Sequence, residues 1–331
     1  MTTVRLVDPL GRRIDYLRLS VTDRCDFRCI YCMPENMQFA ARHEVLSIDE
    51  LYEVASTFIE LGVRRIRLTG GEPLVRKDLN GLLYKLAGHE ELIDLSITTN
   101  GSQLAGRAKE LNRLGVKRLN ISLDSLCRER FAKLTRADRL EKVLDGIEVA
   151  RAAGFKRIKI NSVIQRGVNS EEVYELAMYA LTRGLDISFI EEMPLGVVNS
   201  HNRSSTLVTS DEVLKALSEH LSLNAVAAVT GGPSKYYSVK GYNNHIGFIS
   251  PHSHNFCSQC NRVRLTAEGK LVLCLGQNDA IDLKEVLRDV NYTRDALRSK
   301  IIEAMKLKPA AHGFEHSQDV QVIRFMSVTG G

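Results

Sequence analysis

The sequence predicts an α/β fold with a parallel sheet, because six short β-rich runs are separated by helical stretches of the length found in βαβ units. Repeated βα units place the strands side by side and cover the sheet with helices. The chain has 331 residues, enough for one large α/β domain with an addition or for two ordinary domains. Six units without a seventh fit either an incomplete barrel or an open sheet, and the alternation alone does not choose between them.

The predicted strands and helices alternate regularly in the first part of the chain. The predicted strands are YLRLS at 16–20, RRIRLT at 64–69, DLSITT at 94–99, RLNISLD at 118–124, RIKINSVI at 157–164 and DISFIEEM at 186–193. The helices between them are predicted at 47–62 and near 77–88, 103–114, 139–153 and 171–183. The first helix has the clearest ends, because Ser47 and Glu50 have the spacing of a capping box and Gly62 is a stop signal.

After the sixth strand the alternation breaks at a linker-like stretch, 194–210. The elements predicted beyond it are a helix near 210–221, strands at 231–239 and 245–250, and a hairpin at 261–274. Thr209 and Glu212 have capping-box spacing at the start of that helix. We therefore expect a larger region at 1–195 and a smaller, loop-rich region at 196–331.

Composition and charge exclude several classes of protein. The chain is 44% apolar and 26% charged, as expected for a globular protein, and no apolar run approaches the length of a membrane span. Its 45 cationic side chains are interspersed with 40 anionic ones, and it has no basic tail. We expect no membrane partner, no nucleic acid partner, a cytoplasmic location and a small anionic substrate.

The seven cysteines are the most informative residues. Six of them form two groups of three, Cys25, Cys29 and Cys32 in C-x3-C-x2-C and Cys257, Cys260 and Cys274 in C-x2-C-x13-C. A disulfide framework favours an even count, a short secreted chain and scattered spacing, so clustered cysteines indicate metal ligands or redox thiols, and we favour metal ligands for the first group. Three thiolates leave a fourth ligand position open. Cys127 stands alone and is predicted to be a buried or idle structural cysteine.

Cations recur on the predicted strands at positions i and i+2, which lie on one face of a strand. The pairs are Arg65 with Arg67, Arg157 with Lys159, and Arg262 with Arg264. A buried cation without a partner is costly, so three such pairs indicate an anionic ligand, and polyphosphate suits guanidinium groups. The sequence has no G-x4-G-K-[ST] motif, which excludes an ordinary phosphate loop.

The first cysteine group and its surroundings resemble the radical S-adenosylmethionine superfamily. C-x3-C-x2-C follows the first strand, Tyr31 precedes the last cysteine, and GGEP at Gly70–Pro73 follows the second strand. The resemblance implies that the three cysteines hold a [4Fe–4S] cluster whose open iron binds the amino and carboxylate groups of S-adenosylmethionine. It also implies an incomplete (β/α)6 TIM-like barrel.

The rest of the chain resembles the GTP 3′,8-cyclase family of molybdenum cofactor biosynthesis. The segment NFCSQCNRVRLTAEGKLVLCLG and the terminal Gly330 and Gly331 carry this likeness, which extends over nearly the whole chain. It implies a smaller C-terminal α+β extension that carries a second [4Fe–4S] cluster and a tail that enters the barrel mouth. The implied partners are GTP and an electron donor, and a homodimer is left open.

The implied reaction is a radical ring closure without a side-chain acid or base. A 5′-deoxyadenosyl radical removes the 3′ hydrogen of GTP, and the carbon radical attacks C8 of guanine. Reduction and protonation then give (8S)-3′,8-cyclo-7,8-dihydroguanosine 5′-triphosphate, the first step of molybdenum cofactor biosynthesis.

The resemblance assigns roles to individual residues. The residues implied to line the S-adenosylmethionine site are Tyr31, Gly71, Ser122 and Met193. The residues implied to meet GTP are Arg18, Arg65, Arg67, Thr98, Lys159, Arg262, Val263 and Arg264. One position departs from the family pattern, since Ser188 stands where family members often carry an arginine for the triphosphate.

Two alternatives remain from the residues. The first is another radical S-adenosylmethionine enzyme with an auxiliary cluster, for example one that modifies a peptide. The second is a nucleic-acid-binding protein whose second cysteine group forms a zinc ribbon, with His252 or His254 as the fourth ligand.

Overall fold

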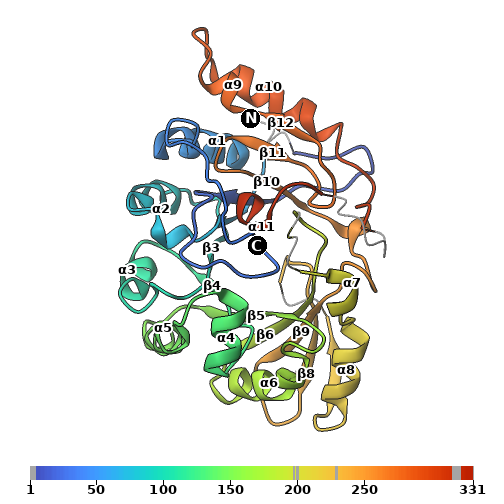
Figure 1. The fold of residues 1–331 in the computed structure, drawn as a ribbon. Coiled ribbons are helices and arrows are strands. Elements are labelled where there is room, and N and C mark those ends of the chain that lie inside the picture. Colours follow the sequence, from blue (N-terminus) through green and yellow to red (C-terminus); the bar gives the residue numbers. More distant parts are fainter. Residues whose placement is uncertain (1–4, 197, 199–200, 228–229, 315–321, 331) are drawn as a thin grey trace.

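A twelve-stranded sheet forms the centre of the computed structural model, which describes residues 5–196, 198, 201–227, 230–314 and 322–330 (Figure 1). Six strands pair in parallel and in chain order. They are β1 (Tyr16–Ser20), β2 (Arg65–Thr69), β3 (Asp94–Thr99), β4 (Arg118–Ser122), β5 (Arg157–Ile164) and β6 (Asp186–Glu191). The predicted run of six strands is confirmed.

Helices occupy the connections between these strands and lie along one side of the sheet (Figure 1). They are α1 (Ile48–Glu60), α2 (Leu79–Ala87), α3 (Ala108–Arg113), α4 (Arg128–Thr135), α5 (Leu140–Ala152) and α6 (Val173–Thr182), with the short turns η1 (Pro73–Val75) and η2 (Ser170–Glu172). The capping box of α1 is confirmed, since the Ser47 hydroxyl accepts a bond from the Glu50 amide and the Glu50 carboxylate accepts one from the Ser47 amide. Helix α3 is shorter than predicted, and α4 lies where no helix was expected.

The C-terminal region adds strands to both edges of the same sheet. On one edge, β10 (Arg262–Leu265) pairs in parallel with β1 and continues into β11 (Lys270–Val272) and β12 (Ala280–Asp282). On the other edge, β9 (His245–Ile249) pairs in parallel with β6 and continues into β8 (Lys235–Val239) and β7 (Leu223–Val226). The predicted hairpin at 261–274 is confirmed as β10 and β11.

The remaining helices belong to this C-terminal region. They are α7 (Arg203–Thr206), α8 (Ser210–Ser218), η3 (Cys257–Gln259), α9 (Lys284–Leu287), α10 (Arg294–Met305) and α11 (Met326–Thr329). Helix α8 begins with the predicted capping box of Thr209 and Glu212. Within the described ranges, no helix combines the length and apolar character needed to cross a membrane.

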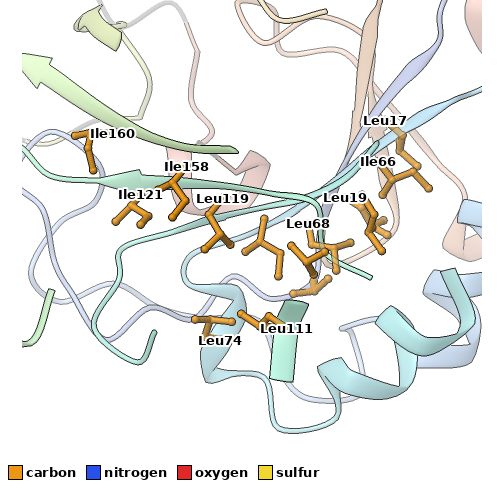
Figure 2. Packing of buried hydrophobic residues seen from close by; sticks show 14 of the residues in the cluster. Leu17, Leu19, Ile66, Leu68, Leu74, Leu111, Leu119, Ile121, Ile158 and Ile160 are labelled. Atoms are coloured by element: carbon orange, nitrogen blue, oxygen red, sulfur yellow. The ribbon is translucent and has the colours of Figure 1, made fainter. Parts of the chain in front are cut away.

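Alternation along the strands gives the sheet one apolar and one polar face. Figure 2 shows side chains such as Leu17, Leu19, Ile66 and Leu68 packed together toward the helices, and all four are fully buried. The residues between them in sequence face the other side. In the strand register, one row of that face contains, in order, Arg264, Arg18, Arg67, Ser96, Arg118 and Arg157. Five cations from five strands therefore stand in one row opposite the hydrophobic core.

Ile121→Ala should lower the free energy of unfolding by ~2–5 kcal/mol, because Ile121 is fully buried in this core and its loss leaves a cavity. Ile93→Ala is the matched control, since Ile93 is 62% exposed and should change the value by less than about 0.5 kcal/mol. Chemical denaturation followed by circular dichroism measures both variants. Equal effects of the two substitutions would contradict the described packing.

Candidate active site

A cavity lies on the polar face of the sheet and is lined by both cysteine groups. Every site residue expected from the sequence lines it except Arg65. Those residues are Cys25, Cys29, Cys32, Cys257, Cys260, Cys274, Tyr31, Gly71, Ser122, Met193, Arg18, Arg67, Thr98, Lys159, Arg262, Val263 and Arg264. The fold thus brings together side chains that are up to about 250 residues apart in sequence.

The first cysteine group lies in the loop that follows β1. Burial raises the pKa of Cys25 and of Cys32 to about 12, and it raises the pKa of Cys29 as well. Asn100 Nδ2 lies 3.7 Å from Cys25 Sγ, and the Phe27 amide donates to the same sulfur at 3.4 Å. Thiols in such a place ionise only beside a strong positive charge, so this donor set fits a metal centre.

The two glycines of GGEP are required by the chain itself. Gly70 has φ +145°, and a Cβ atom there would lie 2.2 Å from the carbonyl oxygen of Thr22. A Cβ atom on Gly71 would lie 2.4 Å from the carbonyl oxygen of Arg24. The glycines therefore allow the backbone that leads to Cys25 to pass directly over the end of β2.

Glu72 joins its own loop, which follows β2, to the end of β3. Its side chain is fully buried and accepts bonds from the Leu74 amide at 2.9 Å, the Thr99 hydroxyl at 2.8 Å and the Asn100 amide at 2.6 Å. Burial raises the pKa of Glu72 to about 7, although these three donors favour its charged form. Because Asn100 contacts Cys25 Sγ, Glu72 also fixes one neighbour of the first cysteine group.

Tyr31 is held by Asp124, a residue that the sequence did not single out. Its hydroxyl donates to Asp124 Oδ2 at 2.7 Å, while Asp124 Oδ1 accepts from the Val163 amide at 2.8 Å. Burial raises the pKa of Asp124 to about 6. Asp124 also lines the cavity, as do Asn120 and Asn161. The sequence pattern that could have indicated Asn120 and Asn161 is a polar residue at every second position of two otherwise apolar strands.

The cations of the cavity are buried beside one another. Burial and then the neighbouring Arg264 and Arg67 lower the pKa of Arg18, and burial followed by Arg262 lowers the pKa of Arg264 to about 10. Burial also lowers the pKa of Lys159. Buried cavity atoms without a hydrogen-bond partner in the described chain include Arg18 Nε, Arg262 Nε, Thr98 Oγ1, Asn120 Nδ2, Asn161 Oδ1 and His312 Nε2. Clustered cations and unpaired polar atoms are the features of a site for a polar anion.

The C-terminal tail reaches this cavity. Arg264 donates to the carbonyl oxygens of Thr329, at 3.3 Å, and Gly330. The Ser327 amide donates to the sulfur of Cys32, and Figure 1 places α11 near the middle of the molecule, beside the strands. The tail thus contacts both the cationic row and the first cysteine group. Gly331 lies outside the described residues.

The second cysteine group surrounds the start of β10 and the end of β11. Burial raises the pKa of Cys274, whereas Lys308 and Arg262 outweigh the effect of burial and lower the pKa of Cys260. Within the described ranges, no three His, Cys, Asp or Glu side chains converge on a single ion position. Three thiols that do not converge on one ion can still bind different metal atoms of a polynuclear centre.

Several further residues singled out in the sequence lie outside the cavity. Arg65 pairs with Asp15 at the start of β2 and does not line the cavity. Ser188 is fully buried, with its hydroxyl 2.9 Å from that of Ser234. Cys127 is exposed, so a buried position is wrong for it, and an idle cysteine stays a prediction. His254 pairs with the exposed Asp211, and neither His252 nor His254 lines the cavity with the cysteines.

Two family models match consecutive parts of the chain. The radical SAM superfamily matches residues 19–180, and Molybdenum Cofactor Synthesis C matches residues 185–314. A GTP 3′,8-cyclase of Ectopseudomonas mendocina is 62% identical over 331 residues and covers 100% of both chains. The chain belongs to the GTP 3′,8-cyclase family. Its relatives include a GTP 3′,8-cyclase 2 of Pseudomonas aeruginosa, 61% identical over 100% of both chains, and a GTP 3′,8-cyclase of Marinobacter nauticus, 51% identical over 100% of both.

Solved structures support the α/β fold of this family member. Streptococcus suis SuiB bound to S-adenosylmethionine has a TM-score of 0.62 at 15% identity, with 86% of this chain and 68% of that chain covered. SuiB bound to the precursor peptide SuiA has a TM-score of 0.63 at 15% identity, over 90% and 65% of the two chains. At such identities the likeness concerns the fold alone, so it does not favour the peptide-modifying alternative over the cyclase family.

Glu72→Ala should lower the free energy of unfolding by several kcal/mol, because it leaves three buried donors without an acceptor, each at a cost of roughly 1–3 kcal/mol. Glu90→Ala is the control, since Glu90 is exposed. Thermal and urea unfolding of the two variants measure the difference. A Glu72 variant as stable as the Glu90 variant would show that the three bonds do not hold the loops.

Proposed function

We propose that the cavity performs the radical cyclisation of GTP to (8S)-3′,8-cyclo-7,8-dihydroguanosine 5′-triphosphate, the first step of molybdenum cofactor biosynthesis. Membership of the GTP 3′,8-cyclase family identifies the activity. The observation that carries the proposal is that one cavity is lined by two groups of three cysteines and by several buried cations. This combination provides for a metal centre, a cosubstrate and a polyphosphate in one place.

Cys25, Cys29 and Cys32 are proposed to hold a [4Fe–4S] cluster, and Tyr31, Gly71, Ser122 and Met193 to line the S-adenosylmethionine site. When bound, the cluster and S-adenosylmethionine supply a carbon radical that can remove hydrogen from an unactivated carbon. The chain's part is to orient the two reactants and to exclude water. Tyr31, fixed by Asp124, and the glycines at the end of β2 give this part of the cavity its shape.

The substrate is proposed to bind among the buried cations of the cavity. Arg18, Arg67, Lys159, Arg262 and Arg264 are all at most 9% exposed, so a triphosphate among them would form charge-assisted bonds away from water. The unpaired Arg18 Nε and Arg262 Nε are donors available to it. Thr98 and Val263 line the same cavity.

Arg65 lies outside the cavity, and Ser188 replaces an arginine that family members often carry, so both positions need a separate account. Arg65 would act from outside the cavity wall, because its guanidinium packs against Gly231 beside the cavity-lining Thr230 and Gly232. Arg118 and Arg157, in the same row as Arg67, are cavity cations that could offset the missing arginine at Ser188. Both already pair with aspartates, which moderates the charge they offer.

Cys257, Cys260 and Cys274 are proposed to hold a second [4Fe–4S] cluster at the opposite wall. The donor set fits, since the three thiols line one cavity and positive charge from Lys308 and Arg262 favours the thiolate of Cys260. We also propose that β1 to β6 with their helices form an incomplete (β/α)6 TIM-like barrel at 1–195, with 196–331 as its α+β extension. The change of matching family model between residues 180 and 185 supports a boundary in this part of the chain.

The proposed reaction requires an electron donor. This donor, the homodimer that the resemblance leaves open and the cytoplasmic location stay predictions. Cationic and anionic side chains are interspersed along the chain, so a small anion is favoured over nucleic acid as its binding partner.

Anaerobic, reduced protein should convert GTP and S-adenosylmethionine to the cyclic product and 5′-deoxyadenosine, as measured by liquid chromatography with mass spectrometry. Cys29→Ala should abolish formation of 5′-deoxyadenosine, because it removes one ligand of the first group. The iron and sulfide of the second group should persist in this variant. Continued 5′-deoxyadenosine formation by Cys29→Ala would contradict the assignment of the first group.

Arg262→Ala should raise the Kd for GTP by about 10- to 150-fold, because a charge-assisted hydrogen bond contributes roughly 1.5–3 kcal/mol. Arg264→Ala should act in the same direction, but it also frees the tail carbonyls. Arg113→Ala at the exposed end of α3 is the control and should bind GTP as the parent does. Equilibrium binding under anaerobic conditions measures all three. An unchanged Kd for Arg262→Ala would exclude this wall as the phosphate site.

A further inference from the structure

Lys308 is a buried cation beside the second cysteine group. It is 4% exposed, and its ammonium donates to the carbonyl oxygens of Arg262, at 3.0 Å, and Leu273. Arg262 lies two residues after Cys260, and Leu273 directly precedes Cys274. One ammonium therefore joins the two chain segments that present these cysteines to the cavity.

Within the part of the chain that the structure describes, no carboxylate is paired with this charge. The described ion pairs engage no Asp or Glu with Lys308, although a buried ammonium without an anion is costly. Backbone carbonyls satisfy its hydrogen bonds but supply no net charge. The groups beside its two carbonyl partners that can carry negative charge are the cysteines of the second group, since Arg262 lies two residues after Cys260 and Leu273 directly precedes Cys274.

Arg12 holds the segment that carries Lys308. Its guanidinium donates to the carbonyl oxygens of Pro309 at 2.6 Å and Ala310 at 2.8 Å, and also to that of Cys257 at 2.7 Å. Its charge is matched by Asp8, which accepts from Arg12 Nε. Arg12 therefore holds these segments together as part of a neutral ion pair. The charge of Lys308 is not neutralised in this way and acts on the cysteine site.

We propose that Lys308 is the positioning residue and counter-charge of the second cysteine site, favouring the more negative oxidation state of the centre bound there. The inference rests on the proposed second cluster. A one-electron reduction adds one negative charge to the centre, so a fixed cation nearby makes that reduction easier. The carbonyl bonds of Lys308 keep this cation at a constant place relative to Cys260 and Cys274.

The test uses the full chain with Cys25, Cys29 and Cys32 changed to alanine, so that iron signals come from the second group alone. In this background, Lys308→Gln keeps a hydrogen-bonding head without the charge, Lys308→Met removes both with a similar length, and Lys308→Arg keeps the charge. Lys306→Gln is the matched control, because Lys306 is exposed two residues away. Each protein is reconstituted anaerobically with iron and sulfide and titrated with a chemical reductant under electron paramagnetic resonance.

Lys308→Gln and Lys308→Met should shift the midpoint potential of the centre to more negative values, while Lys308→Arg and Lys306→Gln should stay close to the background protein. An unchanged potential in whichever neutral variant folds would overturn the inference and leave Lys308 a structural residue only. A background protein that takes up no iron and sulfide would instead overturn the proposed second cluster, and the inference with it. The two failures are therefore distinguishable.

Discussion

The structure depends on a set of cations buried on one face of a parallel sheet. Arg18, Arg67 and Arg264 stand side by side on adjacent strands, and each is at most 7% exposed. Their mutual repulsion and loss of hydration oppose folding. The opposite face of the sheet offsets this cost, because the leucines and isoleucines that flank these arginines in sequence are fully buried against the helices. One alternating pattern thus supplies both the stability of the sheet and a cavity that requires an anion.

Under the proposed function, the tail and the substrate would compete for the donors of Arg264. Arg264 donates to carbonyl oxygens of the tail, which satisfy hydrogen bonds without neutralising the charge. A triphosphate would do both, so it is the stronger partner for this wall. The amide of Ser327 at Cys32 connects the same tail to the first cysteine group. Occupancy of the anion site and the surroundings of that group are therefore physically linked.

The two cysteine groups are braced by buried charges of opposite sign. Near the first, the carboxylate of Glu72 gathers amide and hydroxyl donors from its own loop and from the end of β3. Near the second, Lys308 and Arg12 gather carbonyl oxygens from the segments around the cysteines. Loops lack the regular hydrogen bonds of helices and strands, so a buried charged side chain with several partners can fix them. The surrounding loops are thereby held in place from outside each cysteine group.

The sequence by itself determined the features that depend on neighbours along the chain. Local spacing sufficed for the six parallel strands, the capping box at Ser47 and the two cysteine groups. It did not distinguish Arg67, which lines the cavity, from Arg65, which pairs with Asp15, because both have the same i, i+2 signal. Only the tertiary structure placed C-terminal strands on both edges of the sheet and Lys308 beside Cys260 and Cys274. Those outcomes rest on contacts between distant segments, whose energies no local pattern records.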